Sequence, residues 1–145
     1  PHKTHEEAWW LHQLRNMLVM EAGDGLKLCA GIPRRWLVEG KSVAFENAVT
    51  QFGRIGMTMT SAVNSAQALE GRIRVSLRSG LPATEPRSLV LRVPHPGREE
   101  IAGVRLNGEP WKDFDVAAET VRLPLVDGDT VLRIDYTQPD RQSAD

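Results

Sequence analysis

One group of residues suited to chemistry centres on Trp111, which Lys112 and Asp113 follow directly. An indole ring offers an apolar face to a sugar ring, while neighbouring charged groups form hydrogen bonds to its hydroxyls. Trp111 and Asp113 are therefore candidate carbohydrate-binding residues. The structural alternative, which we favour from the sequence, is a loop tryptophan folded over the edge of a β domain.

A second group is the segment 33–37, with the sequence PRRWL. Arg34, Arg35 and Trp36 could stack on and hydrogen-bond a ligand or an acidic partner, because guanidinium groups combine planar stacking with forked donors. In the alternative interpretation, Trp36 is a wedge between this domain and another one. The leading proline predicts one helical turn here, since its backbone suits a first helical position.

Asp113 and Asp115 form the most plausible pair of carboxylates. Hydrolysis at a sugar uses two carboxyl groups ~5–9.5 Å apart. Residues two apart on an extended chain share one face, which permits the shorter separation. A small hydrolase that uses this pair is thus an alternative function, but aspartates in loops are more often solvated turn residues.

The histidines and the glycine pattern predict neither a metal nor a cofactor. His5 and His12 are two helical turns apart, whereas a helical metal site places its ligands one turn apart, and we expect both to be solvated. His95 lies between two prolines without a nearby nucleophile in the sequence. The sequence contains no glycine-rich phosphate loop and no Gly-x-Ser-x-Gly motif.

Composition limits the classes of partner. The chain has 145 residues, 18 basic and 19 acidic side chains and a net charge of −1, so we expect no nucleic-acid binding and no anionic membrane surface as partner. No apolar run approaches the ~20 residues that span a bilayer. The single cysteine, Cys29, has apolar neighbours and is predicted to be a small buried residue. The chain begins without methionine, which is consistent with a piece of a longer polypeptide.

Residues 4–18 predict one amphipathic helix. Trp10, Leu11, Leu14, Met17 and Leu18 recur at helical spacing, and Trp9 widens the apolar stripe. A single helix cannot bury such a stripe by itself. We therefore expect it to dock on a sheet or on a missing partner, with Trp9, Trp10 and Leu14 as the docking residues.

The rest of the chain has the period of two that is typical of strands with one buried face, as in Ile73, Val75 and Leu77 between arginines and serines. Clusters of Gly, Pro, Asn and Asp separate these segments, and Asn107-Gly108 is a strong tight-turn signal. The pattern predicts a mainly β chain, an antiparallel two-sheet β-sandwich of about nine strands. The expected strands are 19–22, 26–32, 43–48, 54–63, 71–79, 88–94, 101–107, 120–125 and 130–137.

Three blocks of sequence carry a resemblance to a known family: residues 14–21 (LRNMLVME), residues 26–37 with Gly40-Lys41 after them, and residues 104–111 (VRLNGEPW). They resemble the C-terminal region of large bacterial glycoside-hydrolase-like proteins, in which a β-sandwich follows an (α/α)6 barrel. The resemblance implies that 1–18 is a helix remnant of the preceding helical domain and that 19–137 is the sandwich. Residues 138–145, rich in polar residues, are predicted to be a disordered tail.

The resemblance implies a non-catalytic accessory domain of a larger carbohydrate-active enzyme. The missing N-terminal helical-barrel domain would be its partner, and the catalytic carboxylates of the family lie in that barrel, so none can be assigned here. An alternative is a carbohydrate-binding module that uses Trp111 as its sugar-stacking platform.

Overall fold

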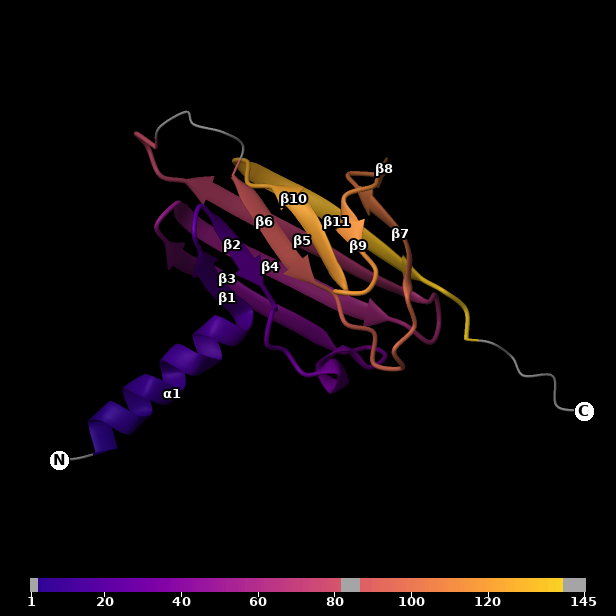
Figure 1. Cartoon of the computed structure of the whole chain (residues 1–145), viewed down its shortest axis with the longest axis horizontal. Coiled ribbons are helices and arrows are strands. Elements are labelled where there is room, and N and C mark those ends of the chain that lie inside the picture. Colours follow the sequence, from indigo (N-terminus) through magenta and orange to yellow (C-terminus); the bar gives the residue numbers. More distant parts are fainter. Residues whose placement is uncertain (1–2, 82–86, 140–145) are drawn as a thin grey trace, which may run out of the picture.

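The computed structural model describes residues 3–81 and 87–139, in which eleven strands form two facing sheets (Figure 1). The predicted tail 138–145 lies outside the described residues from position 140 onward. One sheet has five strands in the order β1 (Val19–Ala22), β2 (Gly25–Leu28), β6 (Ser88–Arg92), β10 (Thr120–Pro124), β9 (Phe114–Asp115). The other has six in the order β3 (Ser42–Thr50), β4 (Gly53–Ala62), β5 (Ala68–Leu77), β11 (Gly128–Tyr136), β7 (Ile101–Leu106), β8 (Glu109–Trp111). The predicted β-sandwich is confirmed.

The core lies between the two sheets and is formed by alternate residues of each strand. In β4, Ile55, Met57 and Met59 are buried and the residues between them face outward. This is the period of two that the sequence displays, and it places one face of each sheet on the core. The same alternation in β5, β6, β10 and β11 contributes Ile73, Val75, Leu89, Leu91, Val121, Leu123, Leu132 and Ile134.

Three details differ from the prediction. The two short strands β8 and β9 were not expected, because two or three residues are too few for an alternating pattern to be visible. β2 ends at Leu28, since the next residue, Cys29, has a positive φ of 57° and its N–H donates to the carbonyl of Leu18. β2 also pairs with β6 in parallel, whereas every other pair of strands within residues 3–81 and 87–139 is antiparallel.

The loops follow the sequence signals. Asn107 and Gly108 both have positive φ and form the turn between β7 and β8, as predicted. The segment after Pro33 forms the one-turn 3-10 helix η1 (Arg34–Leu37). Proline precedes this turn with an extended backbone, so it positions the arginine-rich segment across the end of the sandwich.

The helix α1 (Lys3–Leu18) projects from the sandwich and meets it only at its C-terminal end (Figure 1). At that end the N–H of Gly31 donates to the carbonyl of Met17 at 3.2 Å. A Cβ at position 31 would lie only 3.0 Å from Met17 Cγ, so glycine permits this close approach. Arg15 Nη2 also donates to the carbonyl of Val49 in β3 at 2.8 Å.

Candidate functional site

Of the predicted docking residues, Trp10 and Leu14 lie along one apolar stripe of α1 and Trp9 borders it, and the N-terminal part of the helix is open to solvent. Trp9, Trp10 and Leu11 are 66, 63 and 60% exposed. Leu14 is half-buried, as are Met17 and Leu18, where the helix meets the sandwich. Because residues three and four apart share a helix face, the stripe from Trp10 and Leu11 is continuous with the part that contacts the sandwich. The apolar side chains of α1 are therefore exposed at its N-terminal end and half-buried where the helix meets the sandwich.

Arg34 is held inside the domain by an ion pair. Its guanidinium donates two hydrogen bonds to the Glu119 carboxylate, with Nη2 at 2.8 Å from Oε2, and a third to the carbonyl of His95 at 2.9 Å. Arg92 Nη2 also lies 3.5 Å from Glu119 Oε2. This network fixes η1 against the loop before β10, so Arg34 serves to join segments of the fold.

His95 is buried beside this network. Its Nδ1 accepts hydrogen bonds from the N–H groups of Gly97 and Glu99, at 2.9 and 3.4 Å. Its ring meets the ring of Tyr136 edge-on, at 4.7 Å between centroids, and the Tyr136 hydroxyl donates to the carbonyl of Val93. Burial is the main cause that lowers the pKa of His95. The charge of Arg34 lowers this pKa as well, whereas the carboxylates of Glu99 and Glu119 act in the opposite direction. The neutral ring therefore holds the 95–99 turn.

Arg35 and Trp36 line an apolar groove at the base of α1, with a volume of about 510 Å³. Trp36 is half-buried and packs against the core, while Arg35 is exposed. Leu18 of the helix closes one side of the groove and the start of β3 closes another. The segment 33–37 thus adjoins the C-terminal end of α1, and the role of Trp36 as a wedge between domains stays a prediction.

Trp111 is half-buried at the edge of the six-stranded sheet. Its indole Nε1–H donates to the carbonyl of Arg122 in β10 at 2.9 Å, and its ring packs against the core. These contacts connect β8 of one sheet to β10 of the other. This arrangement fits the structural interpretation of Trp111.

Asp113 and Asp115 lie in the exposed segment that connects β8 to β10. Asp115 Oδ1 accepts a hydrogen bond from the N–H of Ala118 at 2.8 Å, which is the turn-forming role of a loop aspartate. The backbone carbonyl of Asp113 accepts from the N–H of Arg122. Asp115 therefore stabilises the turn, Asp113 links the segment to β10 through its backbone, and the Asp113 carboxylate has no partner among the described residues.

The remaining candidates are placed as follows. His5 and His12 are exposed on α1, and residues 3–81 and 87–139 contain no group of three His, Cys, Asp or Glu side chains able to hold a metal ion. Cys29 is fully buried, as predicted, and burial raises the pKa of its thiol to about 12. In the described part of the chain, no helix has the length and apolar character that crossing a membrane requires.

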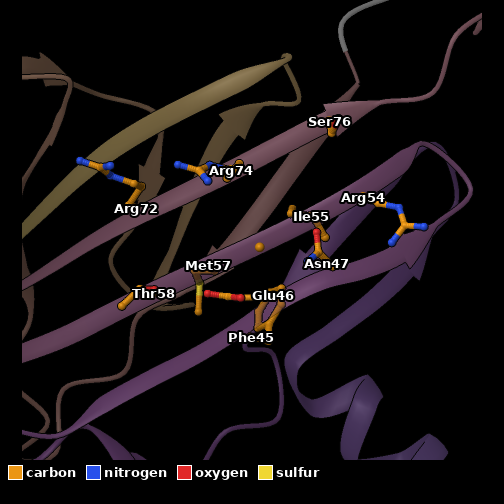
Figure 2. Close-up of a pocket in the computed structure, with 11 residues that line it drawn as sticks. Phe45, Glu46, Asn47, Arg54, Ile55, Met57, Thr58, Arg72, Arg74 and Ser76 are labelled. Carbon is orange, nitrogen blue, oxygen red and sulfur yellow. The ribbon is translucent and has the colours of Figure 1, made fainter.

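The structure also reveals a groove that sequence reasoning missed, on the outer face of the six-stranded sheet. We call it the arginine groove and define it by Asn47, Arg54, Gly56, Arg72 and Arg74. Figure 2 shows the side chains of Glu46 and Asn47 on β3 and those of Arg72 and Arg74 on β5, with β4 between these strands. Its volume is about 270 Å³.

Two backbone features open the arginine groove. The register of β3 with β4 shifts between Phe45 and Ala48, which leaves Glu46 and Asn47 in a bulge, and Asn47 has a positive φ of 53°. Opposite the bulge lies Gly56, where a Cβ would sit 3.4 Å from the carbonyl oxygen of Phe45. The absence of a side chain on this residue leaves the floor of the groove open.

The charges of the arginine groove are unevenly paired. Arg74 donates two hydrogen bonds to Asp129, at 2.8 and 3.1 Å, and Arg72 lies 3.8 Å from the same carboxylate. The bond to Asp129, and then the charges of Asp129 and Glu46, raise the pKa of Arg74. Arg54, in contrast, has no hydrogen bond or ion pair with any residue of the described chain.

Part of this groove is visible in the sequence. Arg72 and Arg74 alternate with buried residues of the strand 71–79, which puts both on its solvent face. The register that sets Arg74 against Gly56, and the bulge that turns Asn47 toward them, depend on strand pairing and have no local signal.

Among solved structures, this chain resembles parts of several glycoside hydrolases. A protein described as a glycoside hydrolase has a TM-score of 0.51 and 14% identity, over 94% of this chain and 20% of its own. A family 31 dextranase of Flavobacterium johnsoniae has a TM-score of 0.50 and 13% identity, over 77% of this chain and 16% of its own. A family 127 β-L-arabinofuranosidase of Geobacillus stearothermophilus has a TM-score of 0.48 and 15% identity, over 92% of this chain and 19% of its own. Neither family models nor curated proteins gave a match.

The expected resemblance to glycoside hydrolases is confirmed at the level of the fold. This chain spans about a fifth or less of the length of these proteins. The fold is thus that of a β domain which, in those enzymes, is one part of a longer chain.

Proposed function

We propose that this chain is a non-catalytic accessory β-sandwich domain of a larger carbohydrate-active enzyme, and that α1 docks the sandwich on a helical domain of the same polypeptide. The observation that carries the proposal is the exposed N-terminal part of the α1 stripe. Two adjacent tryptophans more than 60% exposed are unusual on a surface facing water, and burying them on a neighbour is strongly favourable.

The length of the similar structures supports a partner within the same polypeptide. In the glycoside hydrolases that resemble this chain, the matching part is 16 to 20% of the whole, so most of each enzyme lies outside it. The apolar groove at the base of α1 adjoins the helix, and Trp36 extends the docking surface toward the sandwich.

The contacts of the candidate binding and catalytic residues support an accessory role. Arg34 is engaged with Glu119, and Asp115 is engaged in its own turn. The Trp111 indole N–H bonds to the backbone of β10. These residues all have structural tasks, so the hydrolytic centre is assigned to the remainder of the polypeptide.

The test replaces Trp9 and Trp10 with serine in the longer polypeptide that contains this chain. We expect its thermal unfolding temperature and its glycoside hydrolysis at elevated temperature to fall, because the docking surface loses its two largest apolar groups. The matched control is Thr4→Ser, which changes an exposed residue of α1 that shares a helix face with neither tryptophan. Unchanged stability in the tryptophan variant, or hydrolysis by the 145-residue chain alone, would contradict the proposal.

A further inference from the structure

We propose that the arginine groove binds a sugar that carries a single carboxylate, that is, a uronate residue of an acidic carbohydrate. The carboxylate part of this inference follows from the geometry of the groove, and the carbohydrate part rests on the proposed function. No residue that sequence analysis singled out for binding takes part in this site.

Arg54 supplies the anchor. Arg72 and Arg74 are balanced by Asp129 and the nearby Glu46, so Arg54 carries the one uncompensated positive charge of the group. A guanidinium fork matches a carboxylate with two parallel hydrogen bonds. An arginine on the groove wall without a partner in the described protein is therefore available for an anionic ligand.

The charge of the groove selects the kind of anion. A phosphate ester carries close to two negative charges at neutral pH, whereas a uronate carries one. The Glu46 carboxylate beside the groove repels a second negative charge, and only one positive charge is free to compensate it. This balance favours a monoanionic carboxylate over a phosphate.

The other groups of the groove suit hydroxyls. The Asn47 amide can donate and accept, the Thr58 hydroxyl does both, and the Glu46 carboxylate accepts. The floor at Gly56 has no side chain, so a ligand ring can approach the backbone of β4. A volume of about 270 Å³ is near the lower end of ligand pockets, ~300–1,000 Å³, and fits a small ligand or one unit of a longer chain.

The experiment is an NMR titration of the ¹⁵N-labelled 145-residue chain with galacturonate and glucuronate, in parallel with galactose, glucose, acetate and inorganic phosphate. We expect saturable shifts with one of the uronates, confined to β3, β4 and β5, and binding at least about tenfold weaker for the neutral sugars, acetate and phosphate. The absence of saturable shifts with both uronates would overturn the proposal. Equal or tighter binding of acetate, phosphate or the neutral sugars would overturn it too.

Three variants localise the binding. Arg54→Gln is expected to weaken uronate binding about tenfold or more, because a charge-assisted pair is lost. Gly56→Thr fills the floor without changing the charge and is expected to abolish binding. Arg105→Gln removes an exposed arginine of β7 on the same sheet and is the matched control. Uronate binding that survives Arg54→Gln and Gly56→Thr unchanged would overturn the proposed site. These results are independent of α1, so they do not depend on the outcome of the docking test.

Discussion

Trp9 and Trp10 on α1 differ sharply from Trp36 and Trp111 in the sandwich. Trp36 packs against the core, and Trp111 does the same while its indole N–H bonds to Arg122. Trp9 and Trp10 are 66 and 63% exposed and have no core contact. One pair of rings thus packs within this domain, and the other pair is the one that we propose docks on a surface outside it.

The largest expected difference between the two pairs of tryptophans is in their effect on the free energy of unfolding. We expect Trp36→Ala to lower the free energy of unfolding of the 145-residue chain by about 2–3 kcal/mol, somewhat below the cost for a fully buried tryptophan. Trp10→Ala should change it by less than about 0.5 kcal/mol, as is usual for an exposed residue. Chemical denaturation followed by circular dichroism measures both. Equal losses of unfolding free energy in Trp36→Ala and Trp10→Ala would contradict the distinction between core-packed and exposed tryptophans.

The ion pair that anchors η1 extends this comparison to the segment 33–37. Glu119→Gln leaves Arg34 and Arg92 without their partially buried carboxylate, so we expect a loss of about 1–3 kcal/mol in the same denaturation experiment. Glu109→Gln, at an exposed position of β8, is the matched control and should have almost no effect. A loss of similar size in both variants would show that the Arg34 network does not hold this segment.

Most of the fold follows from local patterns, whereas most of the candidate sites do not. The alternation in 54–63 and 71–79 predicts β4 and β5 and their buried residues, because the period of two is a property of the strand itself. The turn at Asn107-Gly108 is equally local. The tryptophans illustrate the limit, since residue type alone cannot separate Trp36, which packs on the core, from Trp10, which does not.

The arginine groove shows the same limit of local sequence patterns. Arg54 and Arg74 are 20 positions apart in the sequence, and the pairing of β4 with β5 brings them to one face. The bulge at Glu46 and Asn47 has no signal in the sequence. Likewise, nothing local to Arg34 predicts that it meets Glu119, because that contact depends on how the fold brings η1 to the loop before β10.

A smaller effect is expected from pH. The pKa of His95 is lowered in the folded chain, below the unfolded value of about 6.5, so the unfolded chain binds more protons between these two values. The contribution of His95 to stability is therefore present above about pH 6.5 and is lost as the pH falls through the folded pKa. Denaturation at several pH values from 7 to 5 should show this decline.

The control for this pH dependence is His95→Asn. Its side-chain oxygen can accept the hydrogen bonds that Nδ1 accepts from Gly97 and Glu99, but it does not titrate. We expect a flatter dependence of stability on pH in this variant. An identical slope in the two proteins would mean that His95 does not cause the decline.

Hydrogen–deuterium exchange in residues 3–13 of α1 tests the account most directly, measured in the 145-residue chain and in the longer polypeptide that we propose contains it. In the 145-residue chain we expect exchange to be fast, because a helix segment of this length without tertiary contacts is only marginally stable. In the longer polypeptide the same amides should exchange orders of magnitude more slowly, because the proposed docking buries the Trp9–Trp10 face on a partner domain. Equally fast exchange in both proteins would contradict the proposal that α1 is a docking helix.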